Sequence, residues 1–278
     1  MRAGTGNVPG KGGRVEEGRR EQPPLPVGMR GGLRRLRSML AEMGQALRHG
    51  PDRPRSLERI WVDPRQIRHA IIHPSDLLPD LAEGASDRPF WIARSWRGRV
   101  VTRAQFAAVE PHLRPLSHNI KLEACRRHWT EGIPWEATGV YESFFDCIRE
   151  GRQKDECASR EDVLERYARL DAIFAEVKAE GRLKSQMELF PHQDRELGGI
   201  EIHIGPDDEP IFGDSGNHRL AMALVLGLTR IPAMLGFVHE DGLHRLAEYR
   251  REREEETSPG NRRNRTPAAT AVPAPLGG

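Results

Sequence analysis

A short stretch near the end of this 278-residue chain combines the residue types that bind phosphate groups. It consists of Asp214, Ser215, Gly216, Asn217, His218 and Arg219, and an apolar segment with helical periodicity follows it. The start of a helix leaves backbone N–H groups unpaired and carries a partial positive charge, so it attracts anions. Arg219 adds a planar guanidinium that matches phosphate oxygens, and Gly216 lets the backbone approach closely. The stretch therefore predicts an anion pocket.

An ordinary structural role is the alternative interpretation of the same residues. Asp214 or Ser215 before a glycine is a common helix cap, and an arginine in a first turn is often a surface charge. The small side chains of Ala221 and Ala223 would let the helix pack tightly against a sheet in either case. The residue types alone leave both interpretations open.

Residues 200–238 resemble the core of the ParB/sulfiredoxin superfamily, in which a strand leads into a Gly-x-x-Arg-x-x-Ala box at the start of a helix. Residues 216–223 carry this box, and residues 226–232 carry the Leu-Gly-Leu-x-x-Ile-Pro turn into the next strand. Residues 60–67 resemble the first strand of the superfamily more loosely. The resemblance implies an α+β fold with a small mixed sheet, and it leaves the middle of the chain unmatched.

The resemblance also implies a nucleotide pocket, because members of the superfamily bind CTP, use ATP or phosphorylate free serine with the box helix at the phosphates. Carried over by position, the expected nucleotide- or phosphate-binding residues are Ser215, Gly216, Asn217, His218 and Arg219. Asp214 and His218 become candidate catalytic residues, with Asp214 as a base or a magnesium ligand. The expected ligands are ATP, ADP or CTP with Mg²⁺, or another phosphorylated small molecule.

Two departures from the superfamily narrow the expected activity. Sulfiredoxins carry their catalytic cysteine in the box, whereas this chain has Asn217 there, and an amide cannot supply a thiolate nucleophile. Partition proteins continue into a helix-turn-helix domain, whereas residues 244–255 predict only a short charged helix before a Pro/Ala-rich end. A nucleotide-dependent phosphotransferase or nucleotide hydrolase remains compatible with the sequence, because phosphoryl transfer needs mainly positioning and charge neutralisation.

A second polar and aromatic segment, residues 128–138, is the other candidate for chemistry. Trp129 and Trp135 offer flat faces, and Glu136 with Thr138 forms a polar pair able to orient a base or a sugar. If this turn packs over Arg219, Glu136 becomes a third candidate catalytic residue. The alternative is a helix-ending turn that the two tryptophans hold in place.

The elements that must position these residues are predicted from periodicity and from helix stop signals. Strands are expected over 60–62, 90–93, 100–101, 200–204, 210–212 and 231–235, and helices over 103–110, 121–129, 141–150, 159–180 and 217–226. Residues 200–212 are predicted to form a β-hairpin. The folded domain is expected over 56–252, with a helical insertion over about 103–190.

Low-complexity segments flank that domain. Residues 1–55 are expected to form a basic, mostly disordered arm with one amphipathic helical segment over 32–49, and residues 253–278 are expected to form a disordered tail. The arm holds twelve Lys or Arg and five acidic residues, although the net charge of the whole chain is only +2. The remainder is slightly acidic, unlike a fold that grips nucleic acid. The arm supports a second hypothesis, a non-catalytic module that contacts nucleic acid or a protein partner.

Cysteine usage and hydropathy limit the location of the protein. Cys125, Cys147 and Cys157 are odd in number and lack metal-ligand spacing, which predicts reduced thiols, no structural metal and a cytoplasmic location. No apolar run approaches the roughly 18–20 residues of a membrane span. The sequence identifies neither the oligomeric state nor the acceptor of a transferred group.

Overall fold

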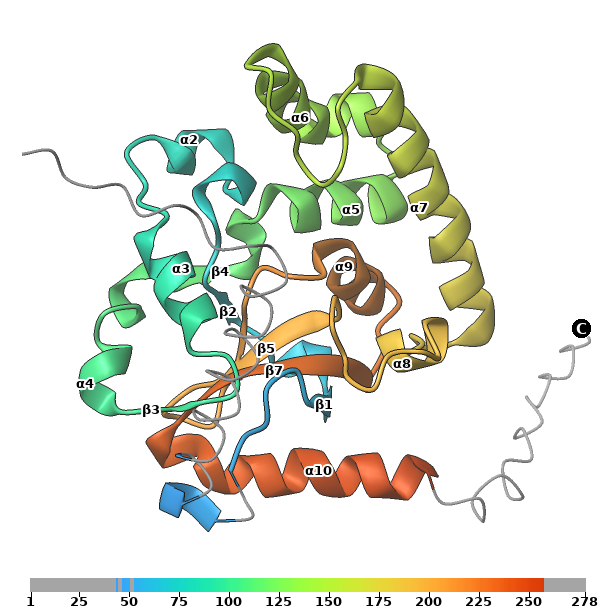
Figure 1. Ribbon diagram of the computed structural model, residues 1–278. Coiled ribbons are helices and arrows are strands. Elements are labelled where there is room, and N and C mark those ends of the chain that lie inside the picture. The colour runs from blue at the N-terminus through green and yellow to red at the C-terminus, as the bar shows by residue number, and fades with distance from the viewer. Residues whose placement is uncertain (1–43, 45–46, 51–52, 258–278) are drawn as a thin grey trace, which may run out of the picture. The chain divides into compact units, whose positions relative to one another are not determined.

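The computed structural model describes residues 44, 47–50 and 53–257, all within the unit Glu42–Gly278 (Figure 1). The tail after 257 and most of the basic arm, with all but a few residues of its expected helix over 32–49, lie outside the described residues. Within the described residues, no helix is long and apolar enough to cross a membrane.

The described residues form one mixed sheet of seven strands in the order β1-β7-β5-β6-β2-β4, with β3 paired to β7. The strands are β1 (Arg59–Val62), β2 (His69–Ala70), β3 (Val100–Val101), β4 (Arg114–Pro115), β5 (Ile200–Ile204), β6 (Pro210–Phe212) and β7 (Ile231–His239). β7 pairs with three strands, because β5 pairs with it in parallel on one edge while β1 and β3 share the other edge. β5 and β6 form the predicted antiparallel hairpin. The α+β class with a mixed sheet is confirmed.

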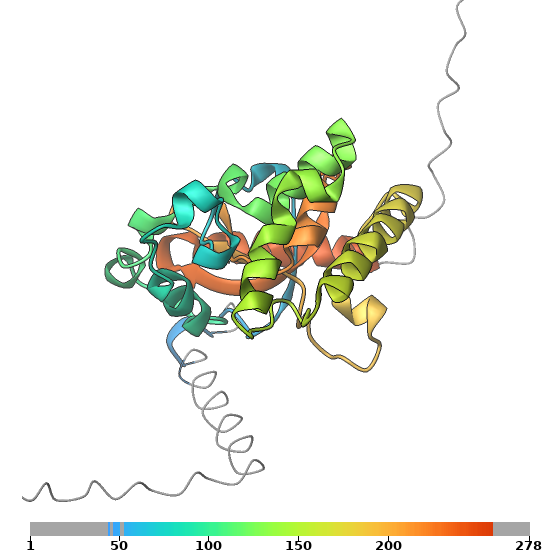
Figure 2. The same cartoon turned by 90° about the horizontal axis from the view of Figure 1, so that it is seen from above.

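Helices cover the sheet in layers. They are α2 (Pro79–Ala82), α3 (Arg88–Ser95), α4 (Arg103–Phe106), α5 (Ile120–Glu131), α6 (Val140–Arg149), α7 (Arg160–Glu180), α8 (Gln186–Leu189), α9 (Asn217–Val225) and α10 (Leu243–Thr257). In Figure 1, α9 lies against one side of the sheet and α10 runs along the other side, next to β1. Figure 2 shows α5 and α6, in green, over the sheet and α9.

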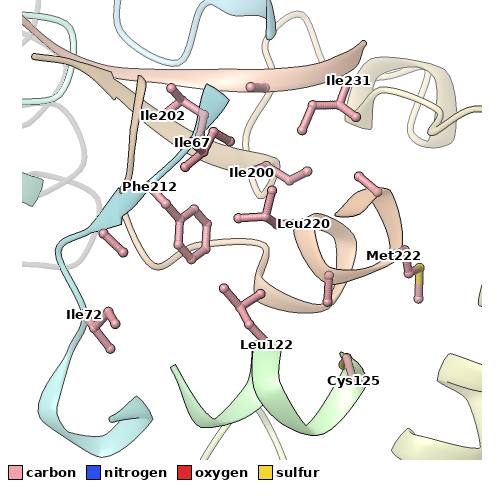
Figure 3. Packing of buried hydrophobic residues seen from close by; sticks show 14 of the residues in the cluster. Ile67, Ile72, Leu122, Cys125, Ile200, Ile202, Phe212, Leu220, Met222 and Ile231 are labelled. Atoms are coloured by element: carbon pink, nitrogen blue, oxygen red, sulfur yellow. The ribbon is translucent and has the colours of Figure 1, made fainter. Parts of the chain in front are cut away.

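The main core lies between the sheet and the layer formed by α9 and α5 (Figure 3). Alternate residues of β5, Ile200, Ile202 and Ile204, face this core, because successive strand side chains point to opposite sides. Leu220 of α9 is fully buried against them, and Leu122 of α5 lies beyond it. This packing fixes the position of α9, and therefore of the predicted anion-binding loop at its start.

Two sequence predictions about elements near the site are wrong. Residues 90–93 form part of α3 rather than a strand, because Phe90 and Ala93 are three positions apart and are buried on the same helical face. Thr102 does cap a helix, through a capping box with Gln105, but α4 ends at Phe106 rather than at residue 110. The other expected helices and strands are present with ends shifted by a few residues, including α7, whose capping box joins Ser159 and Asp162.

The expected insertion over 103–190 is part of the sheet's covering layers. It contributes the edge strand β4, and its helix α5 packs directly on α9. The helix α7 also contacts α9. Residues from the middle of the sequence are therefore placed around the start of the box helix.

Candidate functional site

The loop before α9 is held in an unusual backbone conformation. Gly216 has φ of 80°, and a Cβ at this position would lie 2.8 Å from the Cα of Ile200 on β5. Asp214 also has a positive φ of 60°, a conformation that Asp tolerates better than most residues. Gly216 therefore lets the helix begin close to the backbone of β5. The sequence predicts that Gly216 lets the backbone approach a ligand closely. In the structure, the backbone that Gly216 approaches closely is that of β5.

The first turn of α9 presents unpaired backbone donors. Its N-cap residue, Gly216, has no side chain that could cap the helix. Within the described part of the chain, the backbone hydrogen bonds of α9 begin with the N–H of Leu220, which donates to the Gly216 carbonyl oxygen at 3.0 Å. The amides of residues 217–219 precede it and have no acceptor one turn back. These donors and the helix dipole make the start of α9 attractive to an anion.

Asn119 joins the starts of two helices at this point. Its side-chain oxygen accepts hydrogen bonds from the amides of Lys121 and Leu122 and so caps α5. Its Nδ2 donates to Asp214 Oδ1 at 2.7 Å and to Asn217 Oδ1 at 2.8 Å. The Asn119 side chain is completely buried. One amide therefore sets the position of the α9 loop relative to the first turn of α5.

A cavity of about 720 Å³ opens at the start of α9. This volume is within the range of roughly 300–1,000 Å³ that is usual for small-molecule sites. All six residues of the predicted phosphate loop line it, together with side chains from α3, α5, α7 and the loop before α7. The lining includes Arg94, Lys121, Lys154, Arg166, Asp76 and Asp155, and all of residues 214–219.

The polar wall of the cavity is a network of charges in which the cations outnumber the carboxylates. Lys121 Nζ lies 2.8 Å from both Asp76 and Asp155, and Lys154 Nζ lies 2.8 Å from Asp76. Arg166 adds a third positive charge, 3.9 Å from Asp155. Burial opposes the charge on Lys121, but Asp76 and Asp155 outweigh it and raise the pKa of the ammonium. Three cations thus face two carboxylates.

Arg94 adds a fourth positive charge. It is exposed, lies over the rings of Phe90 and Trp91 at 5.6 and 5.8 Å from their centroids, and lines the cavity. No hydrogen bond or ion pair joins its guanidinium to another of the described residues. Arg94 is therefore available to an anionic ligand without breaking an existing bond.

Asp214 is the carboxyl of the loop itself. Its Oδ2 accepts the backbone N–H of His73 at 2.8 Å, and its Oδ1 accepts from Asn119. Burial, and then the negative charge of Asp76, raise the pKa of Asp214 to about 8. A carboxyl with this pKa is mostly neutral at pH 7, so it does not cancel the positive charge of the cavity, and it titrates in the range useful to a general acid or base.

Two predicted residues of the loop have structural contacts that limit their roles. Arg219 lines the cavity, but its Nη2 donates to the carbonyl oxygen of Lys184, so part of the guanidinium is engaged by the chain before α8. His218 is buried, with Nε2 at 3.4 Å from the hydroxyl of Tyr167. Burial, and then the charge of Lys121, lower the pKa of His218 to about 3. A histidine with this pKa is a weak base near neutral pH.

The segment of residues 128–138 forms a separate structural cluster. Asp171 of α7 accepts hydrogen bonds from the indole N–H of Trp129 at 2.9 Å and of Trp135 at 3.1 Å, and His128 Nε2 lies 3.1 Å away. Glu136 is exposed and does not line the cavity at α9. The two tryptophans thus attach the turn to α7, and the structure does not bring Glu136 together with the predicted loop.

The cavity does not fit a magnesium ion held by the protein. Mg²⁺ prefers carboxylate oxygens, but the lysines already bind Asp76 and Asp155, while Asp214 accepts two hydrogen bonds from protein donors. Among the described residues, no group of three or more His, Cys, Asp or Glu side chains is placed to hold a metal ion. The side-chain cations supply the positive charge of this site.

Local sequence patterns predict the loop at the start of α9, but they do not predict most of the residues that surround it in the structure. Asn119 carried a usable signal, since an Asn directly before a helical segment is a strong N-cap. Lys121, Lys154 and Arg94 carried none, because their pairing depends on contacts between segments far apart in the chain. Cys125, Cys147 and Cys157 are free thiols buried away from this lining.

Comparison with known proteins adds no relative. No protein-family model matches the chain, and neither the curated proteins nor the solved structures contain a match. The resemblance to the ParB/sulfiredoxin superfamily therefore stays a prediction from the residues of the box.

Proposed function

We propose that the protein binds a small phosphorylated molecule, a nucleotide being the expected class, with a phosphate group at the start of α9. The observation that carries the proposal is the excess of cations around the unpaired amides of that helix. Lys121, Lys154 and Arg166 outnumber Asp76 and Asp155, and Arg94 adds a further charge. Arg219, which also lines the cavity, brings the lining to five cations against two ionised carboxylates, so a ligand with about three negative charges would neutralise it.

The test places one negative charge at the start of α9. Ser215 lines the cavity and is half-buried, and the hydrogen bond that its hydroxyl makes within the described part of the chain is a long one of 3.4 Å, to the carbonyl oxygen of Gly199. Ser215→Glu should weaken binding of tripolyphosphate and ATP about ten-fold or more, because like charges at a few ångströms cost about 1–4 kcal/mol. Ser215→Gln has nearly the same shape without the charge, and should stay within about three-fold of the wild type.

Thermal shift and calorimetry with tripolyphosphate, ATP, ADP, CTP and GTP measure these affinities, since a ligand that binds the native state raises its melting temperature. Binding by the wild type that Ser215→Glu and Ser215→Gln weaken equally would contradict a phosphate position at α9. Absence of binding of all five compounds to the wild type would contradict the proposal as a whole.

A second candidate function, phosphoryl transfer, is favoured by the pKa of Asp214. Of the three residues predicted to be catalytic, Asp214 alone both lines the cavity and titrates near neutral pH. In this reaction an acceptor hydroxyl oxygen forms a bond to phosphorus, the bond from phosphorus to the leaving phosphate oxygen breaks, and the hydroxyl proton moves to the Asp214 carboxylate.

A further inference from the structure

The cavity has aromatic lining residues in addition to the charged ones. Phe90 and Trp91 of α3 line it, with ring centroids 5.0 Å apart and planes at 76°. Phe90 is buried, whereas Trp91 is 52% exposed, which is high for the largest side chain. The indole N–H of Trp91 donates to Asp87 at 3.0 Å, which holds the ring in place. A large exposed aromatic side chain in a cavity wall is a typical contact for a flat ligand group.

His73 connects this aromatic wall to the phosphate position. Its ring packs edge-on against Phe90 and Trp91, with centroids at 5.1 and 6.0 Å. Its backbone N–H donates to Asp214, two residues before the N-cap of α9. The aromatic wall and the start of α9 are thus separated by one residue, within the length of a single small ligand.

Arg94 combines a positive charge with contact to the aromatic rings. Its guanidinium covers part of both aromatic rings and has no hydrogen-bond or ion-pair partner among the described residues, so it would contact the ring and the phosphate end of the same ligand. A phosphorylated sugar or amino acid would leave the exposed face of Trp91 in water. A nucleotide or another phosphorylated molecule with a flat ring would cover it.

We propose that Trp91 and Arg94 of α3 form a subsite for a flat aromatic ring, so that the ligand is a phosphorylated molecule carrying such a ring, with its phosphate at α9. This inference rests on the proposed function and names the other end of the same ligand. Local sequence patterns do not indicate this subsite, since they predict a strand over residues 90–93.

The test compares ligands with and without a ring on the full-length protein. Trp91→Ala should weaken ATP binding about ten-fold, because stacking of a base on an aromatic side chain is worth about 1–3 kcal/mol. The same variant should leave tripolyphosphate binding within about two-fold of the wild type. Trp91→Phe keeps a flat ring and should retain most of the ATP affinity. Phe190→Ala is the matched control, since Phe190 is an exposed aromatic residue, 45% exposed, away from the cavity lining.

Each outcome separates the two proposals. Equal affinity of the wild type for ATP and tripolyphosphate, with no effect of Trp91→Ala on either, would overturn the ring subsite and leave the phosphate site standing. Equal losses for both ligands would overturn it as well, because Trp91 would then act on the fold of the cavity; the melting temperature of the free variant would show this directly. Failure of tripolyphosphate and every nucleotide to bind the wild type would overturn the phosphate site itself.

Discussion

Asp214 controls how the site responds to pH. Its carboxyl has a usual pKa of 3.8, and burial raises the pKa to about 8 in the folded protein. The folded state therefore holds a proton between these two values that the unfolded state releases. The contribution of Asp214 to stability is fully present below pH 3.8 and is lost as the pH rises toward about 8.

We expect Asp214→Asn to remove this dependence. The amide cannot ionise, so the decrease in the free energy of unfolding between pH 5 and pH 8.5 should be smaller by on the order of 1 kcal/mol or more in the variant. Urea denaturation at both pH values measures the difference. The change with pH is the informative quantity, because the Asn amide also faces the donor groups of His73 and Asn119 and lowers stability at every pH. Equal pH dependence in the two proteins would show that Asp214 is not protonated in the native state.

The same variant tests the transfer reaction. If Asp214 is the base, nucleotide turnover should rise with pH and level off above about pH 8, where the carboxylate is present. Asp214→Asn should reduce turnover by about 100-fold or more, the usual contribution of general base catalysis. Binding of tripolyphosphate by calorimetry is the control, since it should persist. Full turnover by the variant would exclude Asp214 as the base.

The elements near the site differ in how well local sequence predicts them. The hairpin of β5 and β6 and the long helix α7 are predicted correctly, because alternation and the Ser159 capping box act over a few residues. Residues 90–93 are mistaken for a strand because four apolar residues in a row fit either element until their burial is known. The cavity wall depends on contacts such as Lys121 with Asp76, 45 positions apart, which no local pattern encodes.

Asn119 links two elements, and its loss should cost more than a helix cap. Asn119→Ala removes the cap of α5, worth about 1 kcal/mol, and leaves buried oxygens of Asp214 and Asn217 without their donor, at about 1–3 kcal/mol each. We expect a loss of about 3 kcal/mol or more in urea denaturation. Ser159→Ala removes a cap from α7 far along the chain and should cost about 1 kcal/mol. Equal losses in the two variants would show that Asn119 acts as a cap alone.

The two hypotheses drawn from the sequence concern different regions of the protein. Every residue that lines the cavity lies between His73 and Arg219, whereas the basic excess of the chain lies in residues 1–55. The proposed binding of a small phosphorylated ligand and the hypothetical contact with a nucleic acid would therefore depend on different parts of the chain.

Deleting residues 1–43 tests the two hypotheses separately. The deletion removes nine Lys or Arg and four acidic residues and leaves the cavity residues in place. Tripolyphosphate affinity by calorimetry should stay within about two-fold of the full chain. A nucleic-acid contact made by the arm would weaken steeply with salt in the full chain and disappear on deletion, because such binding depends on the release of counterions from phosphates. Loss of tripolyphosphate binding on deletion, with an unchanged melting temperature, would instead place the anion site in the arm and contradict the cavity at α9.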